Sequence, residues 1–181
     1  MTEQELEKAK HPIGLFVKPD KITQEIIKDY ISSISTLPVK LRKATGRLTD
    51  EQLDTSYREG GWTIRQLVHH LADAHINGYI RFKLALTEET PTIKPYDENK
   101  WSELIDAQTM PVEPSLKLIE GLHNRWTVLL NSMTEEDFKK TYFHPEHGKK
   151  LFLDEVLGEY AWHSDHHLAQ ITELKKRKKW D

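Results

Sequence analysis

The sequence contains no cysteine among its 181 residues. This absence excludes disulfide bonds, a thiolate nucleophile supplied by the chain itself and zinc sites built from cysteine. Any tight transition-metal site must therefore be built from histidine, aspartate and glutamate.

The sequence also lacks an excess of charge of either sign. It has 26 lysines and arginines against 29 aspartates and glutamates, which gives a net charge of -3 with neutral histidines. The basic run at 175–179 complements the carboxyl end of an expected helix, where cations are favourable. We therefore expect neither a nucleic acid nor a membrane surface as a partner.

Long hydrophobic runs are missing as well. The amino terminus, MTEQELEKAK, is polar, and no stretch approaches the roughly 20 apolar residues of a membrane span. We expect a soluble, cytoplasmic protein that forms a single domain over residues 1–181, since no linker, repeat or low-complexity tract divides the chain.

Helical periodicity dominates what is present. Apolar residues recur at intervals of three and four in four long segments, which is typical of amphipathic helices. These segments are 22–48, 64–86, 115–133 and 153–179. Pro38 should kink or divide the first, and the Thr63 to Gln66 stretch fits a capping box at the start of the second.

Two connections interrupt this pattern. Residues 90–114 contain four prolines and are too long for a simple turn, so they suggest a crossover. Residues 142–153 favour a small β-hairpin with Pro145 to Gly148 at its turn. Short helical turns are expected at Thr49 and Thr134. The predicted fold is all-α, a four-helix bundle with one long crossover, and such bundles commonly build metal sites in their cores.

The candidate functional residues are His163 and His167 in the last helix. Four residues along a helix correspond to about 40° of rotation and roughly 6 Å of rise, so both imidazoles can reach one ion. His166 projects well outside the apolar face and is not expected to be a ligand. The competing interpretation is that both histidines are hydrogen-bonded core residues, because a chain with 10 histidines contains such pairs by chance.

A catalytic zinc site needs three protein ligands and one open position. The third ligand should come from the second helix, where His69 points away from the apolar face. His70 lies on the flank of that face and His75 lies within it, so helical phase leaves both as candidates. Asp73 and Glu159 are spaced to support the ligand rings from the outer shell.

The chain resembles a known family, the DinB/YfiT-like metalloenzymes, and in particular their bacillary YfiT group. The resemblance covers nearly the whole chain. It is carried by the segments 60–71 (GGWTIRQLVHHL), 79–84 (YIRFKL) and 160–163 (YAWH) together with His75, His166 and His167.

This resemblance implies a four-helix bundle of unusual connection, a homodimer and a divalent metal held by His70, His163 and His167. Zinc is the expected ion, with nickel or another divalent ion as the alternative. The implied activity is metal-dependent hydrolysis of a small-molecule substrate. The alternatives are transfer of a low-molecular-weight, bacillithiol-type thiol, and a bundle that binds a metal or ligand without catalysis.

Overall fold

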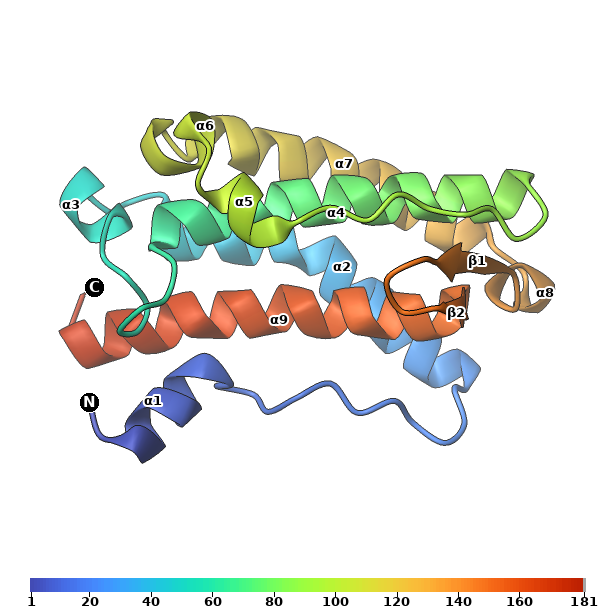
Figure 1. The fold of residues 1–181 in the computed structure, drawn as a ribbon, viewed down its shortest axis with the longest axis horizontal. Helices are drawn as coiled ribbons and strands as arrows, with labels where there is room; N and C mark the ends of the chain where they lie inside the picture. Colours follow the sequence, from blue (N-terminus) through green and yellow to red (C-terminus); the bar gives the residue numbers. More distant parts are fainter. Residues whose placement is uncertain (181) are drawn as a thin grey trace.

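Four long helices form the body of the molecule (Figure 1). The computed structural model describes residues 1–180. The long helices are α2 (Gln24–Thr45), α4 (Ile64–Thr87), α7 (Glu113–Ser132) and α9 (Leu153–Lys178). Their bounds lie within a few residues of the predicted segments, so the all-α prediction is confirmed.

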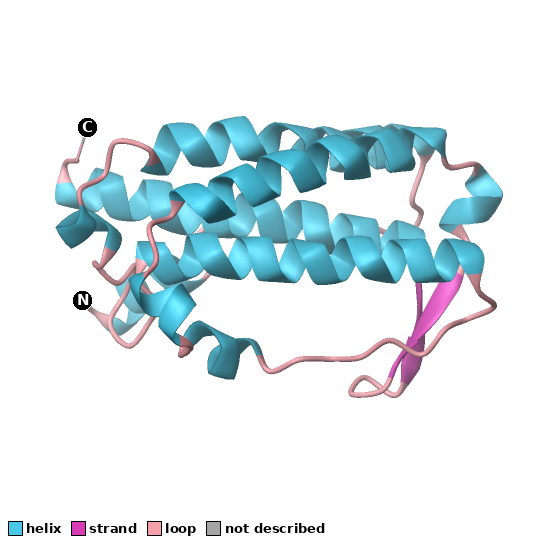
Figure 2. Cartoon of the chain, turned by 90° about the horizontal axis from the view of Figure 1, so that it is seen from above, coloured by secondary structure: helices cyan, strands magenta, loops and turns pink. Residues whose placement is uncertain are grey.

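The connection between the helices is unusual for a bundle. Helix α2 packs against α7 and α9, and α4 packs against the same two helices. Figure 1 shows α2 and α9 running in one direction and α4 and α7 in the other, so both neighbouring pairs α2/α9 and α4/α7 are parallel. Joining the ends of parallel neighbours requires a return along the bundle, and the segment between α4 and α7 provides it along one side (Figure 2). The predicted crossover is confirmed.

Short elements decorate the bundle. They are α1 (Glu3–Lys10), α3 (Asp50–Leu53), α5 (Glu98–Ser102), α6 (Ile105–Thr109) and α8 (Glu135–Phe138). Strands β1 (Thr141–His144) and β2 (Lys149–Phe152) pair antiparallel, with His144 opposite Lys149, so the predicted hairpin is confirmed. Helix α1 was not predicted, because it is short and almost wholly polar. A capping box between Thr2 and Glu5 starts it.

The two local features predicted inside the helices have different outcomes. The capping box of α4 is confirmed, since the Thr63 side chain accepts from the Gln66 N–H and the Gln66 side chain accepts from the Thr63 N–H. Pro38 was expected to kink or divide the first helix; the division is wrong, because α2 continues through this residue, and the kink stays a prediction. Proline nevertheless removes one backbone donor from the helix, which leaves the carbonyl of Ile34 without its usual partner.

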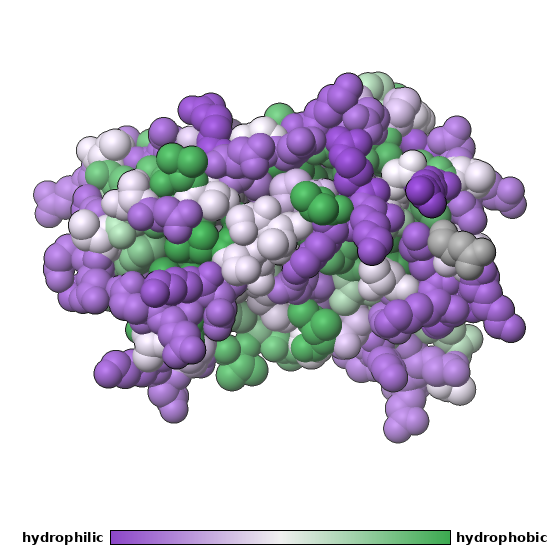
Figure 3. Space-filling model, turned by 180° about the vertical axis from the view of Figure 1, so that it is seen from behind, coloured by the Kyte–Doolittle hydropathy of each residue, from purple (hydrophilic) through white to green (hydrophobic). Residues whose placement is uncertain are grey.

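The interior of the bundle contains two apolar clusters and a set of buried histidines. One apolar cluster contains Phe82, Trp126 and Leu157, and a second contains Leu67 and Ile171. Three buried histidines lie between these clusters in sequence, His75, His123 and His167, and the buried His70 lies among residues of the second cluster. The back face in Figure 3 is largely hydrophilic, with apolar residues in separate groups. Within residues 1–180, no helix combines the length and apolar character that crossing a membrane requires.

Close packing of α4 on α9 depends on a glycine. A Cβ atom added to Gly78 would overlap Cζ of Tyr160 and would lie 2.9 Å from Cη2 of Trp126. Both contacts are far inside van der Waals distance. Gly78 therefore allows the Tyr160 ring to sit against α4, one turn before the His163 position of α9.

Replacing Gly78 with alanine is expected to lower the free energy of unfolding by about 1–2 kcal/mol. Overpacking costs about 1–3 kcal/mol, and the higher helix propensity of alanine offsets about 0.5–1 kcal/mol of it. Gly121→Ala is the matched control, because its Cβ would meet nothing within 4 Å. Urea unfolding of both variants checks the prediction, which fails if Gly78→Ala is as stable as Gly121→Ala.

Candidate metal centre

Three histidine side chains from two helices converge in the middle of the bundle. Nε2 of His163 on α9 lies 3.0 Å from Nε2 of His70 on α4 and 3.1 Å from Nε2 of His167 on α9. Each of the three histidines offers one ring nitrogen, and these nitrogens lie within 4.8 Å of one another, close enough to hold one metal ion. Tetrahedral zinc with bonds of about 2.0–2.1 Å places its ligand atoms about 3.3 Å apart, so the spacing fits such an ion.

The outer nitrogen of His163 is held by another histidine. Its Nδ1 lies 3.2 Å from Nε2 of His75, and Nδ1 of His75 lies 2.9 Å from Nε2 of His123. Nδ1 of His123 in turn lies 2.6 Å from the carbonyl oxygen of Ile34. We call this series, from Ile34 through His123 and His75 to His163, the histidine chain.

The histidine chain has only one consistent direction. A carbonyl oxygen only accepts, so Nδ1 of His123 must donate to Ile34, and the neutral His123 ring then accepts at Nε2. By the same reasoning His75 donates from Nδ1 and accepts at Nε2. His163 must therefore donate from Nδ1, which leaves a lone pair on its Nε2, the atom in the cluster.

The start of the histidine chain is explained by a proline. The Ile34 carbonyl would normally accept from the N–H four residues later, and that position is Pro38, which has no N–H. The free carbonyl is completely buried with Ile34 and accepts from His123 on α7 instead. Pro38 on α2 thus contributes to the orientation of a residue on α9.

The ring of His167 is oriented by a glutamine. Its Nδ1 lies 2.8 Å from Oε1 of Gln170. The Gln170 amide nitrogen donates to the carbonyl of Lys10 at 2.9 Å, which fixes which end of the amide is the acceptor. His167 therefore donates from Nδ1 and, like His163, carries a lone pair on Nε2.

These assignments test whether the cluster suits a cation. Burial lowers the pKa of His70 to about 4 and the pKa values of His163 and His167 well below their usual range, so the rings are neutral at neutral pH. A proton on Nε2 of His70 could form a hydrogen bond with Nε2 of His163, but with no other nitrogen of the cluster at the same time. The lone pairs of His163 and His167 would still face each other at 3.1 Å. A divalent cation bound between them removes this repulsion, so the donor set fits a metal.

The other residues considered from sequence take different roles. His75 does not join the cluster but supports His163. Among the described residues, neither Asp73 nor Glu159 forms a hydrogen bond with a cluster histidine. Glu159 instead lines the cavity beside the site. Sequence reasoning missed His123 and Gln170 as supporting residues, although His123 lies three residues before Trp126 on the same apolar stripe.

Two histidines that were predicted to point away from the core are buried. His166 is only 6% exposed because α1 covers that side of α9, and its Nε2 lies 2.9 Å from the Gln170 amide nitrogen. His69 is 7% exposed beneath the crossover and α7, with Ser115 Oγ 2.7 Å from its Nδ1. Helical phase alone does not predict this burial, because it does not account for short elements packed outside a bundle. Neither belongs to the cluster of three.

The cluster is reached from one side through a cavity. Trp62, in the loop before α4, packs on His70 with ring centroids 4.6 Å apart and covers the cluster there. His163, the partly exposed member, lines a cavity of about 460 Å³ between α4, the crossover, the hairpin and α9. This volume is typical of pockets for small molecules.

Comparisons with known proteins agree with this architecture. The family model of the DinB superfamily matches residues 34–171. The chain belongs to the DinB superfamily. The match includes every histidine of the cluster and of the histidine chain.

Two relatives of this DinB-superfamily chain have names that describe a function. The chain is 51% identical over 170 residues to "Putative metal-dependent hydrolase YfiT" of Bacillus subtilis, and the match covers 94% of this chain and 96% of that protein. It is 53% identical over 171 residues to "Putative metal-dependent hydrolase OB0782" of Oceanobacillus iheyensis, covering 94% and 98%.

One solved structure matches the fold closely. It is described as "YfiT from Bacillus subtilis is a probable metal-dependent hydrolase with an unusual four-helix bundle topology". The TM-score is 0.93 at 49% identity, and the match covers 96% of this chain and 99% of that one. The four-helix bundle and the resemblance to the YfiT group are thereby confirmed.

Proposed function

We propose that the protein is a metal-dependent hydrolase that binds one divalent cation, zinc in the first place, through His70, His163 and His167. The observation that carries the proposal is the pair of Nε2 lone pairs facing each other at 3.1 Å on His163 and His167. Both Nδ1 protons are already donated to protein acceptors. The names of the relatives support hydrolysis as the reaction class.

The chemistry follows from the donor set. Three neutral imidazoles leave a divalent ion its full charge and an open position, and an ion so held lowers the pKa of water and polarises a carbonyl oxygen. The chain's own residues orient the reactants. His163 presents the site to the cavity, and Trp62 shields His70 on one side. Burial raises the pKa of Tyr160 to about 12, so its hydroxyl at the cavity wall keeps its proton.

We expect the protein, purified without chelators, to contain about one divalent ion per chain. We also expect its hydrolysis of a simple activated ester or amide to stop after chelation and to return with added zinc. Elemental analysis by mass spectrometry and a chromogenic ester assay measure the two quantities on the same samples. Apo protein that has been reloaded with zinc serves as the control for chelator damage.

Two outcomes contradict the proposal. Absence of metal under non-chelating purification removes its basis, and a hydrolytic rate unchanged by chelation rules out the metal as the catalyst. A parallel assay offers a small thiol and a generic electrophile. Metal-dependent thiol transfer without any hydrolysis would replace the hydrolase with a thiol transferase.

A further inference from the structure

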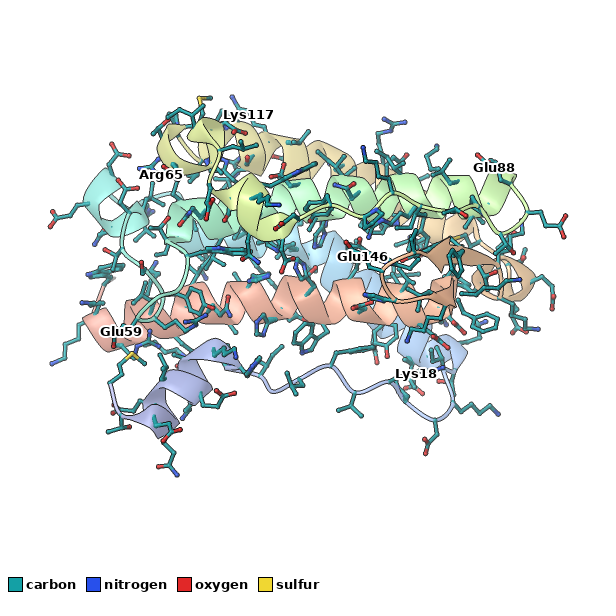
Figure 4. The ribbon with its side chains drawn as sticks, viewed as in Figure 1. Lys18, Glu59, Arg65, Glu88, Lys117 and Glu146 are labelled. Carbon is teal, nitrogen blue, oxygen red and sulfur yellow. The ribbon has the colours of Figure 1, made fainter. Side chains whose placement is uncertain are left out.

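The cavity beside His163 is rich in acidic side chains and holds one guanidinium. Arg81 of α4 lines it, and Figure 4 shows Glu146, another lining residue, at the hairpin. The carboxylates that line the same cavity are Asp97, Glu98, Glu146 and Glu159. Arg81 and His163 line the same cavity, so one molecule bound there can contact both.

Most N–H donors of the Arg81 guanidinium have no close acceptor. Its Nη1 lies 3.5 Å from the Tyr160 hydroxyl and its Nη2 lies 3.4 Å from the Lys94 carbonyl oxygen, both long for hydrogen bonds. No carboxylate among residues 1–180 lies within 4.0 Å of the guanidinium, although four line the cavity. Because a guanidinium has five N–H donors, most of them are available to a ligand.

His144 at the end of β1 provides a second donor on the same wall. The residue is 7% exposed, and its Nδ1 is buried without a hydrogen-bond partner in the described structure. A buried lone pair without a partner is tolerated better than a buried N–H, so the proton belongs on Nε2. Burial, with the nearby His147 and Arg81, lowers the pKa of His144, which keeps the ring neutral with a single N–H.

We propose that Arg81 and His144 form a subsite that binds a carboxylate of the substrate, so that the bond to be hydrolysed lies toward His163. The inference rests on the proposed function for the identity of the reacting group, but the binding itself does not need the metal. A planar guanidinium matches a carboxylate with two parallel hydrogen bonds. The acidic lining favours a monoanion over a phosphate dianion, because each added negative charge is repelled by the carboxylates.

The test compares three probes of similar size on the full-length protein as purified: benzoate, benzamide and phenyl phosphate. By isothermal calorimetry we expect benzoate to bind about tenfold more tightly than benzamide, the size of effect expected from a charge-assisted pair. We expect Arg81→Gln to weaken benzoate binding by about tenfold and to leave benzamide unchanged. Arg125→Gln is the matched control, since Arg125 is exposed on α7 outside the cavity.

Two further variants keep the test decisive. Arg81→Lys retains the charge without the planar fork, so its benzoate affinity should lie between those of the wild type and Arg81→Gln. His144→Phe keeps a ring stacked on His147 but removes the donor, and it should weaken benzoate binding several-fold. Unchanged benzoate affinity in both Arg81 variants overturns the proposal, as does phenyl phosphate binding more tightly than benzoate through Arg81. Metal content is measured on every sample, so failure of the proposed metal site is distinguished from failure of this subsite.

Discussion

Replacing His163 with alanine is expected to reduce the bound divalent metal from about one ion per chain to less than about a tenth of that. The substitution removes the central member of the cluster, whose Nε2 lies 3.0–3.1 Å from both other ligand atoms. The two remaining imidazoles, His70 and His167, cannot complete a three-ligand site. Metal content after dialysis against a weak chelator, measured by elemental mass spectrometry, checks the prediction.

The chain provides a matched control three residues away. His166→Ala also removes a buried imidazole from α9, but this ring packs on Trp162 and lies outside the cluster. Gln170 keeps its bond to the Lys10 carbonyl and so still supports His167. Metal should be retained in His166→Ala. Equal loss from the two variants would mean that unfolding, and not ligand removal, releases the ion.

Replacing His75 with leucine is expected to lower the metal affinity by about 10–100-fold without removing a ligand. The reason is the histidine chain: without the His75 acceptor, Nδ1 of His163 loses the bond that keeps the proton away from Nε2. Competition with a chromophoric chelator measures the affinity. His69→Leu is the control, because it removes another buried histidine from α4, one that bonds to Ser115 and not to the cluster.

The far end of the histidine chain provides an independent measurement. Pro38→Ala restores an N–H to α2, and this donor should compete with His123 for the Ile34 carbonyl. Nitrogen-15 NMR of the imidazole rings in the metal-free protein should then show a mixture of His163 tautomers where the wild type shows one. If His75→Leu binds metal as tightly as the wild type and Pro38→Ala keeps a single tautomer, the histidine chain does not orient His163.

Much of the fold could be predicted because it depends on neighbours in sequence. Apolar spacing predicted the four long helices, and the Thr63 to Gln66 capping box marked the start of α4. The four prolines between 90 and 114 indicated the crossover, since a proline-rich segment of that length cannot be a tight turn. The sequence did not predict that α2 continues undivided through Pro38, or that α1 forms. Helix α1 packs against α9, and a contact between such distant segments has no local sequence signal.

The candidate site, like the fold, could be predicted only where it depends on neighbours in sequence. The i,i+4 spacing of His163 and His167 is a local property of one helix, and it was visible in the sequence. Helical phase could not choose between His70 and His75, and only the resemblance to the DinB/YfiT-like family favoured His70. The structure brings His70 to the cluster and puts His75 behind His163, so both candidates contact the site with different roles. The expected homodimer stays a prediction.

The sequence by itself determined which segments are helices, that a metal site must be built from histidines and acids, and that two histidines of α9 share one face. Only the tertiary structure decided which ring nitrogens carry lone pairs. The proton on His163 is set by His75 on another helix, and the proton on His167 is set by Gln170, whose amide is fixed by Lys10 of α1. His163 meets His70 across 93 positions of sequence, and the histidine chain ends 89 positions from His123 at a carbonyl freed by Pro38. Hydrogen bonds between residues so far apart in sequence form only when the helices pack, so periodicity and motifs in the sequence cannot predict them.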